Sequence, residues 1–175
     1  MDTILHIDSA KIWRGGQQQV LYLAQKLKDY ESIIACPPQS PLAERAKATG
    51  LKVSSVQMHG EWDLLAVYKL KKIIRNNSIK IVHLHSPHAQ ALGLLAAKSA
   101  GKCKVVLSRR VDFHIRKNIL SRVKYSNVDR IIAISERVKE VLVADGLPLE
   151  KIDVVYSGVD IELSLIHISE PTRPY

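Results

Sequence analysis

Short runs of β-branched and aliphatic residues alternate with amphipathic segments along almost the whole chain. Such alternation predicts parallel strands joined by helices, because a parallel connection needs a crossover of about a dozen residues or more. The predicted strands are residues 3–8, 32–36, 52–56, 79–85, 104–108, 130–134 and 153–156. The predicted helices are residues 16–28, 41–49, 62–76, 87–100, 118–126 and 136–145. The sequence therefore predicts an α/β fold with a Rossmann-like, doubly wound parallel sheet.

Local signals mark several of these helices. Apolar residues spaced i, i+3, i+4 and i+7 predict a helical stripe that faces the sheet: Val20, Leu23, Ala24 and Leu27. Ser86 stands before Pro87, which predicts an N-cap followed by proline at the first helical position. Ser135 is the predicted N-cap of the last helix, and Gly146 is expected to end that helix.

The composition is that of one ordinary globular domain. Of the 175 residues, 46% are hydrophobic and 25% are charged, which excludes a disordered or collagen-like chain. No run reaches the ~18 apolar residues that span a bilayer, and no basic-then-apolar leader opens the chain. Cys36 and Cys103 are too few for a disulfide framework, so we expect reduced thiols and a cytoplasmic location. Residues 1–162 are expected to form one domain, since no linker precedes Gly158.

Basic residues outnumber acidic ones, with 26 Lys and Arg against 17 Asp and Glu, and the net charge is +9. The excess is concentrated in residues 109–130, which hold seven basic residues and two acidic ones. A basic surface attracts nucleic acids, phosphorylated metabolites or anionic lipid headgroups, and it can also be only a solvated face. Because neither a recognition helix nor an aromatic-rich sheet face is evident, no nucleic-acid partner is expected.

The last segment, residues 163–175, breaks the alternating pattern. Its sequence begins LSLIHISEPTR, which resembles the translation of a transposon-end adapter used in preparing sequencing libraries. We therefore expect this segment to be foreign to the natural protein, whose own sequence would continue differently after Glu162. The alternative is a genuine flexible C-terminus.

Two glycines stand where the first strand meets the first helix, in the segment SAKIWRGG of residues 9–16. Gly15 and Gly16 lack side chains, so a ligand can approach the backbone, and the free amides of a helix start attract phosphate or developing negative charge. Arg14 adds a cation nearby. The segment matches neither the dinucleotide-binding nor the P-loop glycine motif. The alternative is a tight turn that joins strand to helix.

Histidines mark the fourth predicted strand, IKIVHLHS in residues 79–86. His83 and His85 share one face, and His85 stands at the carboxyl end, where ligands bind in such sheets. We expect His85 either to form hydrogen bonds in a ligand cleft or to be a satisfied structural histidine, and His83 to be structural. A zinc site that includes His88 is not expected, because two strand histidines provide at most two ligands and no third is evident.

Charged residues follow the fifth predicted strand in the segment SRRVDF, residues 108–113. Arg109, Arg110 and Asp112 can bind phosphate or sugar hydroxyls, because arginine donates paired hydrogen bonds and a carboxylate accepts from hydroxyls. The alternative is an arginine–aspartate pair on the surface.

In order along the chain, these segments resemble the N-terminal domain of GT-B glycosyltransferases, in particular family four of retaining, nucleotide-sugar-dependent enzymes. The resemblance covers residues 3–162 and includes IKIVHLHSPHA in residues 79–89 and SRRVDF in residues 108–113. Its most specific part is RIIAISERVKEVLVADGLPLEKIDVVYSGVD in residues 130–160, where Ser157 replaces the asparagine common in the family.

The resemblance implies a two-domain enzyme that transfers a hexosyl or other glycosyl group in the cleft between its domains. A C-terminal domain, absent from this sequence, would bind the nucleotide sugar with a basic pair and a Glu-x7-Glu element. Retaining transfer by this fold resembles front-side displacement, in which the leaving diphosphate must be stabilised. Gly15 and Gly16 would face the donor phosphates with Arg14 nearby, and His85 would line the cleft near the transferred sugar as the catalytic histidine. No cofactor or metal is implied.

The resemblance assigns acceptor binding to Arg109, Arg110 and Asp112, and the start of the interdomain hinge to Gly158 and Asp160. The fragment alone is expected to be inactive, because its donor site cannot form. The basic stretch fits a cell-envelope glycan or lipid-linked acceptor and peripheral contact with the anionic inner face of a membrane. The alternative function is that of a standalone α/β domain that binds a nucleotide or a phosphorylated ligand.

Overall fold

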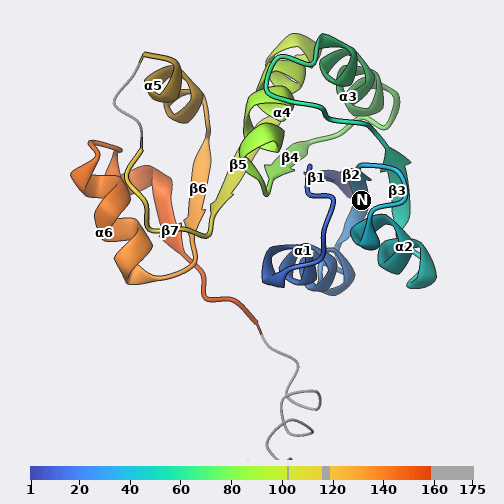
Figure 1. The fold of residues 1–175 in the computed structure, drawn as a ribbon, viewed down its shortest axis with the longest axis horizontal. Coiled ribbons are helices and arrows are strands. Elements are labelled where there is room, and N and C mark those ends of the chain that lie inside the picture. Colours follow the sequence, from blue (N-terminus) through green and yellow to red (C-terminus); the bar gives the residue numbers. More distant parts are fainter. Residues whose placement is uncertain (102, 116–118, 159–175) are drawn as a thin grey trace, which may run out of the picture.

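The computed structural model describes residues 1–101, 103–115 and 119–158 (Figure 1). They form one parallel sheet in the order β3-β2-β1-β4-β5-β6-β7. The strands are β1 (Asp2–Ile7), β2 (Tyr30–Cys36), β3 (Lys52–Ser55), β4 (Ile81–Leu84), β5 (Lys104–Arg109), β6 (Arg130–Ala133) and β7 (Ile152–Val154). The helices are α1 (Gly15–Lys26), α2 (Pro41–Ala48), α3 (Leu64–Asn76), α4 (Pro87–Ala100), α5 (Ile119–Ser126), α6 (Glu136–Ala144) and the short 3-10 helix η1 (Leu149–Lys151). The predicted foreign segment and the hinge residue Asp160 lie outside the described residues.

The predicted doubly wound α/β fold is confirmed. α1 and α2 cover one face of the sheet, and α3, α4 and α5 cover the other (Figure 1). α6 contributes Val138 and Leu142 to the same core that α3 and α4 cover. The order of the strands reverses between β1 and β4, where Ile4 pairs with Ile81. Ligands of such sheets bind at this switch point, beyond the carboxyl ends of the strands.

Two strand ends differ from the prediction in ways that matter for the site. β4 ends at Leu84, although the next residue, His85, still donates its backbone amide to the Ile7 carbonyl at 3.0 Å. β5 is one residue longer than predicted and includes Arg109. Because side chains alternate along a strand, this extra residue places Arg109 and Arg110 on opposite faces of the sheet.

The stripe predicted for the first helix is partly wrong. Val20 and Ala24 are buried as expected, and Leu21 is buried beside them. Leu23 and Leu27 are only half-buried. Right-handed connections place α3 to α6 on the opposite face, so in the described part of the chain no helix covers the α1 side of β5, β6 and β7. Leu23 therefore borders an open groove.

Capping of the helices agrees with the sequence except at α4. Ser135 accepts the Val138 amide at 3.3 Å, and Gly146 follows α6 with a φ of 87°. Ser86 holds the N-cap position before Pro87, but its side chain makes no capping bond. Its Oγ instead accepts the Ser9 amide at 2.9 Å and lies 2.7 Å from the Ser9 Oγ. This serine thus ties the loop after β1 to the start of α4.

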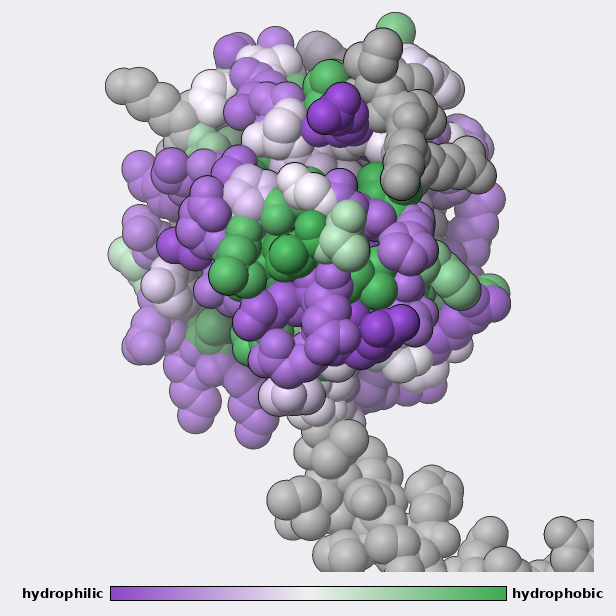
Figure 2. Space-filling model, turned by 90° about the vertical axis from the view of Figure 1, so that its left-hand side faces the viewer, coloured by the Kyte–Doolittle hydropathy of each residue, from purple (hydrophilic) through white to green (hydrophobic). Residues whose placement is uncertain are grey.

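Apolar side chains are exposed on the side where α5 and α6 lie, among them Val123, Val143 and Leu149. Figure 2 shows apolar side chains gathered there within a hydrophilic surround. A cavity of about 330 Å³ on this side is bordered by Ile115 and Leu147, which pack against the main core. None of the described helices combines the length and the apolar character needed to cross a bilayer.

Replacement of Gly93 by alanine should destabilise the domain. A Cβ at this buried position in α4 would collide with Leu84 Cδ2 and lie 2.9 Å from Ile7 Cδ1. Overpacking of this kind costs about 1–3 kcal/mol of unfolding free energy, which urea denaturation of the 175-residue chain would measure. The exposed Lys98→Ala change in the same helix is the matched control, with an expected effect within about 0.5 kcal/mol. A Gly93→Ala chain as stable as the control would contradict the close packing.

Candidate functional site

A buried carboxylate fixes the start of α1. Asp8 follows β1 and is fully buried. Its Oδ1 accepts the Ala10 amide at 2.7 Å, and its Oδ2 accepts the Gln17 Nε2 at 3.0 Å. Gln17 Oε1 in turn accepts the Arg14 amide at 3.2 Å. Gln17 therefore links the end of β1 to the first turn of α1, and it holds the glycine segment in place.

The two predicted glycines form the first turn of α1, at the switch point of the sheet. A Cβ on Gly15 would have no atom within 4 Å, and a Cβ on Gly16 would make only ordinary contacts at 3.9 Å with Arg110. Neither glycine has a positive φ. The fold itself does not require glycine at either position. Because neither residue has a side chain, a ligand can reach the backbone of this turn. The side chain of Arg14, at the N-cap, is exposed.

Gly16→Ala should therefore leave the fold intact. Alanine loses less backbone entropy in a helix, so the free energy of unfolding should stay equal or rise by up to about 1 kcal/mol. Urea denaturation beside the Gly93→Ala chain checks this, because the same chemical change should have the opposite sign at the two positions. A clear loss of stability in Gly16→Ala would show that the fold itself needs this glycine.

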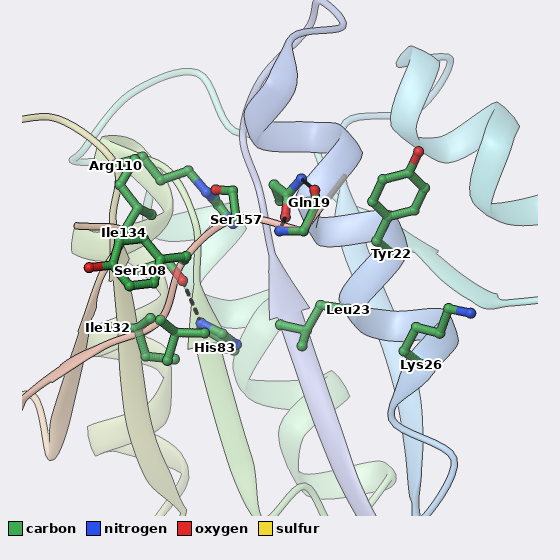
Figure 3. A pocket seen from close by; sticks show the side chains of 13 residues that line it. Gln19, Tyr22, Leu23, Lys26, His83, Ser108, Arg110, Ile132, Ile134 and Ser157 are labelled. Atoms are coloured by element: carbon green, nitrogen blue, oxygen red, sulfur yellow. Dashed lines mark hydrogen bonds between the residues drawn. The ribbon is translucent and has the colours of Figure 1, made fainter. Parts of the chain in front are cut away.

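Arg110 brings a cation to the glycines. Its side chain extends from the end of β5 across the groove toward α1 (Figure 3). The Nη2 atom lies 3.5 Å from His85 Nδ1, whereas Nε and Nη1 are buried without a hydrogen-bond partner among the described residues. Burial lowers the pKa of the Arg110 guanidinium, and the negative charge of Asp8 opposes that lowering. Unpaired cationic donors beside a helix start are an arrangement that binds anions.

Three buried histidines lie behind Arg110. His6 Nδ1 is 3.2 Å from His85 Nε2, and His83 Nε2 is 2.8 Å from the Ser108 Oγ. Burial lowers the pKa of His6 to about 4 and holds the pKa values of His83 and His85 well below their usual range. The rings are therefore neutral at pH 7. Because Arg110 only donates, His85 Nδ1 must accept, which places the His85 proton on Nε2, where it is donated to His6.

This cluster has the geometry of a hydrogen-bond chain. One potential ligand atom from each of the three rings lies within 4.8 Å of the others. However, the His83 and His85 ring centroids are 4.1 Å apart with a tilt of 35°, so their in-plane lone pairs do not converge on one point. The nearby Arg110 charge further disfavours a cation there. His88, the third residue of the zinc hypothesis, is exposed, and the absence of a metal requirement stays a prediction.

The structure separates the three predicted acceptor residues. Arg109 turns to the α5 side, where Nη1 donates to the Tyr125 hydroxyl at 3.2 Å and Nη2 to the Phe113 carbonyl at 2.5 Å. Asp112 is exposed in the loop that follows β5. Arg110 alone lies with Gly16 and His85. A shared role of Arg109, Arg110 and Asp112 in acceptor binding stays a prediction. The structure places Arg109 and Arg110 on opposite faces of the sheet.

A groove of about 260 Å³ runs beside α1 over the uncovered strands (Figure 3). Leu23, Ile132 and Val155 give it apolar walls, and Arg110 lies among its polar lining. The predicted hinge residue Gly158 borders the groove, and Gln19 holds it from α1. The Gln19 Nε2 donates to the Gly158 carbonyl at 2.5 Å, and its Oε1 accepts the Gly158 amide at 3.0 Å.

Sequence reasoning missed His6, Asp8, Gln17 and Gln19. A signal existed for Asp8, an acidic residue at the end of an apolar strand, where it must be either a ligand contact or a buried anchor. His6 becomes recognisable only from the pairing of β1 with β4, which sets it opposite His83. The two glutamines carry no signal, because an amide on a helix surface is ordinarily solvated.

A family model described as Glycosyltransferase Family 4 matches residues 13–163. The chain belongs to this family. The resemblance noted in the sequence is thereby confirmed. In this chain the glycine turn, His85 and Arg110 lie together at the switch point. No curated protein matches the sequence.

Solved structures share the fold at low sequence identity. Alr3699/HepE of Anabaena, in complex with UDP-glucose, is 17% identical with a TM-score of 0.76, over 92% of this chain and 45% of that one. The lipopolysaccharide outer core galactosyltransferase WaaB is 17% identical with a TM-score of 0.65, over 92% and 47%. UDP-N-acetylglucosamine 2-epimerase from Rickettsia bellii is 12% identical with a TM-score of 0.64, over 90% and 45%. The chain thus spans less than half the length of each.

Proposed function

We propose that this chain is the acceptor-side domain of a glycosyltransferase that takes its sugar from a nucleotide sugar, and that Arg110 acts on the leaving diphosphate with Gly15 and Gly16. The observation that carries this proposal is the Arg110 guanidinium, whose Nε and Nη1 are buried and unpartnered beside the start of α1. This assignment moves Arg110 from the acceptor to the donor side of the predicted site.

The chemistry of sugar transfer requires such a group. When the bond between the sugar and the diphosphate breaks, negative charge grows on the leaving oxygen, and donors already aimed at that position stabilise it. The amides of Gly15 and Gly16 and the guanidinium of Arg110 would share this task. Asp8 and Gln17 hold the α1 turn in place before the substrate arrives, so little reorganisation is needed.

His85 would act through Arg110. Both of its ring nitrogens are engaged, one with Arg110 and one with His6. A ring whose pKa lies well below its usual range is a poor proton donor at neutral pH, so orienting the guanidinium is the role that fits. We propose that His85 is a positioning residue for Arg110 at the edge of the cleft and does not itself transfer a proton.

We also propose a donor, an acceptor and a stereochemical course for the reaction. UDP and UDP-glucose are bound by the Anabaena relative, which supports a uridine diphosphate sugar as donor. The WaaB relative and the basic residues 109–130 support a lipid-linked or lipopolysaccharide-type acceptor at the inner face of a membrane. A second domain beyond the Gly158–Asp160 hinge would complete the donor site, and transfer would proceed with retention and without a metal.

Transfer by the intact protein tests this function. The gene is recovered from source DNA past the codon for Glu162, and the product is incubated with labelled nucleotide sugars and lipid-linked acceptors. We expect transfer with retained anomeric configuration by NMR, and no turnover by the 175-residue chain. Nucleotide binding without transfer would favour the standalone binding module. Turnover by the 175-residue chain alone would contradict the need for a second domain.

A further inference from the structure

The start of α3 exposes an unusual amount of apolar surface. Trp62, Leu64, Leu65 and Tyr68 are 76%, 73%, 74% and 65% exposed, and we call these four residues the α3 apolar patch. Leu64, Leu65 and Tyr68 lie in the first turns of α3, and Trp62 immediately precedes its N-cap, Asp63. An exposed apolar group of this size, concentrated in seven consecutive residues, 62–68, marks an interaction site more often than single scattered residues do.

The α3 apolar patch does not contribute to the core of the domain. α3 buries its opposite side, Ala66, Leu70 and Ile74, in the core and packs along α4. Helical spacing places Leu64, Leu65 and Tyr68 away from those three residues. The other tryptophan, Trp13, is half-buried and covered by Arg45 at 4.0 Å from its ring centroid, so Trp62 is the one with a free face.

Positive charge continues the same exposed side of α3. Lys69, Lys72 and Arg75 are exposed, and no acidic residue occurs between Leu64 and Asn76. The two nearest carboxylates are already engaged. Asp63 accepts the Ala66 and His59 amides at 3.0 and 3.1 Å as the N-cap, and Glu61 pairs with Lys124 of α5. The amide bonds leave Asp63 negatively charged, but Lys69, Lys72 and Arg75 outnumber it, so the surface around the patch is net basic.

We propose that α3 docks on a lipid bilayer that carries anionic headgroups. The α3 apolar patch would enter the boundary between headgroups and acyl chains, and Lys69 and Lys72 would lie on the lipid phosphates. Aromatic and leucine side chains next to lysines suit this boundary, since each ring and each lysine stem is apolar with a polar end. Charge complementarity favours an anionic bilayer over a second copy of this basic chain, which would be repelled.

Docking would place the site at the membrane. α3 begins beyond the carboxyl end of β3, and the glycine turn lies beyond the carboxyl end of β1 in the same parallel sheet. The two are thus at one edge of the molecule, where a lipid-linked acceptor would be presented. The biological role of docking rests on the proposed lipid-linked acceptor. Docking itself requires neither a bound donor nor sugar transfer.

Sedimentation of the 175-residue chain with vesicles tests the inference. The vesicles are phosphatidylcholine with and without phosphatidylglycerol. We expect binding that requires phosphatidylglycerol and weakens with salt, and a blue shift of Trp62 emission in a Trp13→Phe chain. Each lysine near an anionic surface contributes about fivefold to affinity, so Lys69→Glu with Lys72→Glu should weaken binding by about tenfold or more. Leu64→Ser with Leu65→Ser should weaken it similarly.

The charge-matched control is Lys28→Glu with Lys47→Glu, two exposed lysines outside α3. This chain should keep most of its binding, and thermal melts should show that all variants fold. No binding to phosphatidylglycerol vesicles, or equal loss in the control, would overturn docking through α3. Self-association that the leucine changes abolish, without vesicle binding, would also overturn it. Absence of docking would leave the transfer assay unaffected, and an inactive full-length enzyme that still docks would leave this inference standing.

Discussion

Acidification should destabilise this domain steeply, starting near pH 6.5. His6, His83 and His85 are buried and neutral in the folded state, and burial lowers the pKa of His6 from 6.5 to about 4. Unfolded histidines take up protons below pH 6.5, whereas the folded ones do not, so stability is full above pH 6.5 and falls as the pH drops toward 4. His6 alone accounts for about 3 kcal/mol over that range, and the other two act in the same direction.

Urea denaturation between about pH 7 and about pH 5 measures this effect, with an expected slope of about 1.4 kcal/mol per pH unit for each histidine that titrates. His6→Gln removes one of these groups and should make the slope shallower. His88→Gln, at an exposed position, should leave the slope unchanged. The same free energy of unfolding at both pH values would contradict the neutral cluster, and with it the hydrogen-bond chain that orients Arg110.

Loss of Arg110 should cost the full-length enzyme most of its activity. A charged hydrogen bond contributes about 1.5–3 kcal/mol, so Arg110→Ala should lower kcat/KM by about 10- to 150-fold. Arg109→Ala is the matched control, because it removes the same side chain one residue earlier. Arg109 bonds to Tyr125 and Phe113 on the opposite face, so its loss should reduce stability more than transfer.

Steady-state kinetics with varied donor and varied acceptor distinguish the two assignments of Arg110. An effect that appears with every acceptor and persists at saturating acceptor supports action on the diphosphate. If Arg109→Ala reduces transfer as much as Arg110→Ala, and both act mainly on acceptor KM, the original prediction of a joint acceptor site holds instead.

The fold was predictable because its information is local. Strand and helix segments follow from apolar periodicity, as at β2 and α4, and parallel pairing follows from their alternation. The exceptions have physical causes. Leu23 matches a core stripe but borders a groove, because burial depends on which sheet face receives the later helices.

The site was predictable only in part. Gly16, His85 and Arg110 were singled out because the carboxyl ends of parallel strands share one edge, and the structure does bring them together. The division of Arg109 from Arg110 depends on whether β5 ends at residue 108 or 109, a difference smaller than sequence patterns resolve. His6 required the strand order, which no local pattern encodes.

In the proposed site, the α1 turn and Arg110 bind one and the same diphosphate. A double-mutant cycle on the full-length enzyme distinguishes one shared site from two separate ones. The nucleoside diphosphate affinity is measured by calorimetry for wild type, Gly16→Ala, Arg110→Ala and the double variant. Groups that share one ligand are coupled, so we predict that the double variant binds little worse than Arg110→Ala alone. Independent, additive losses, or unchanged affinity in both single variants, would show that the α1 turn and Arg110 do not share one diphosphate.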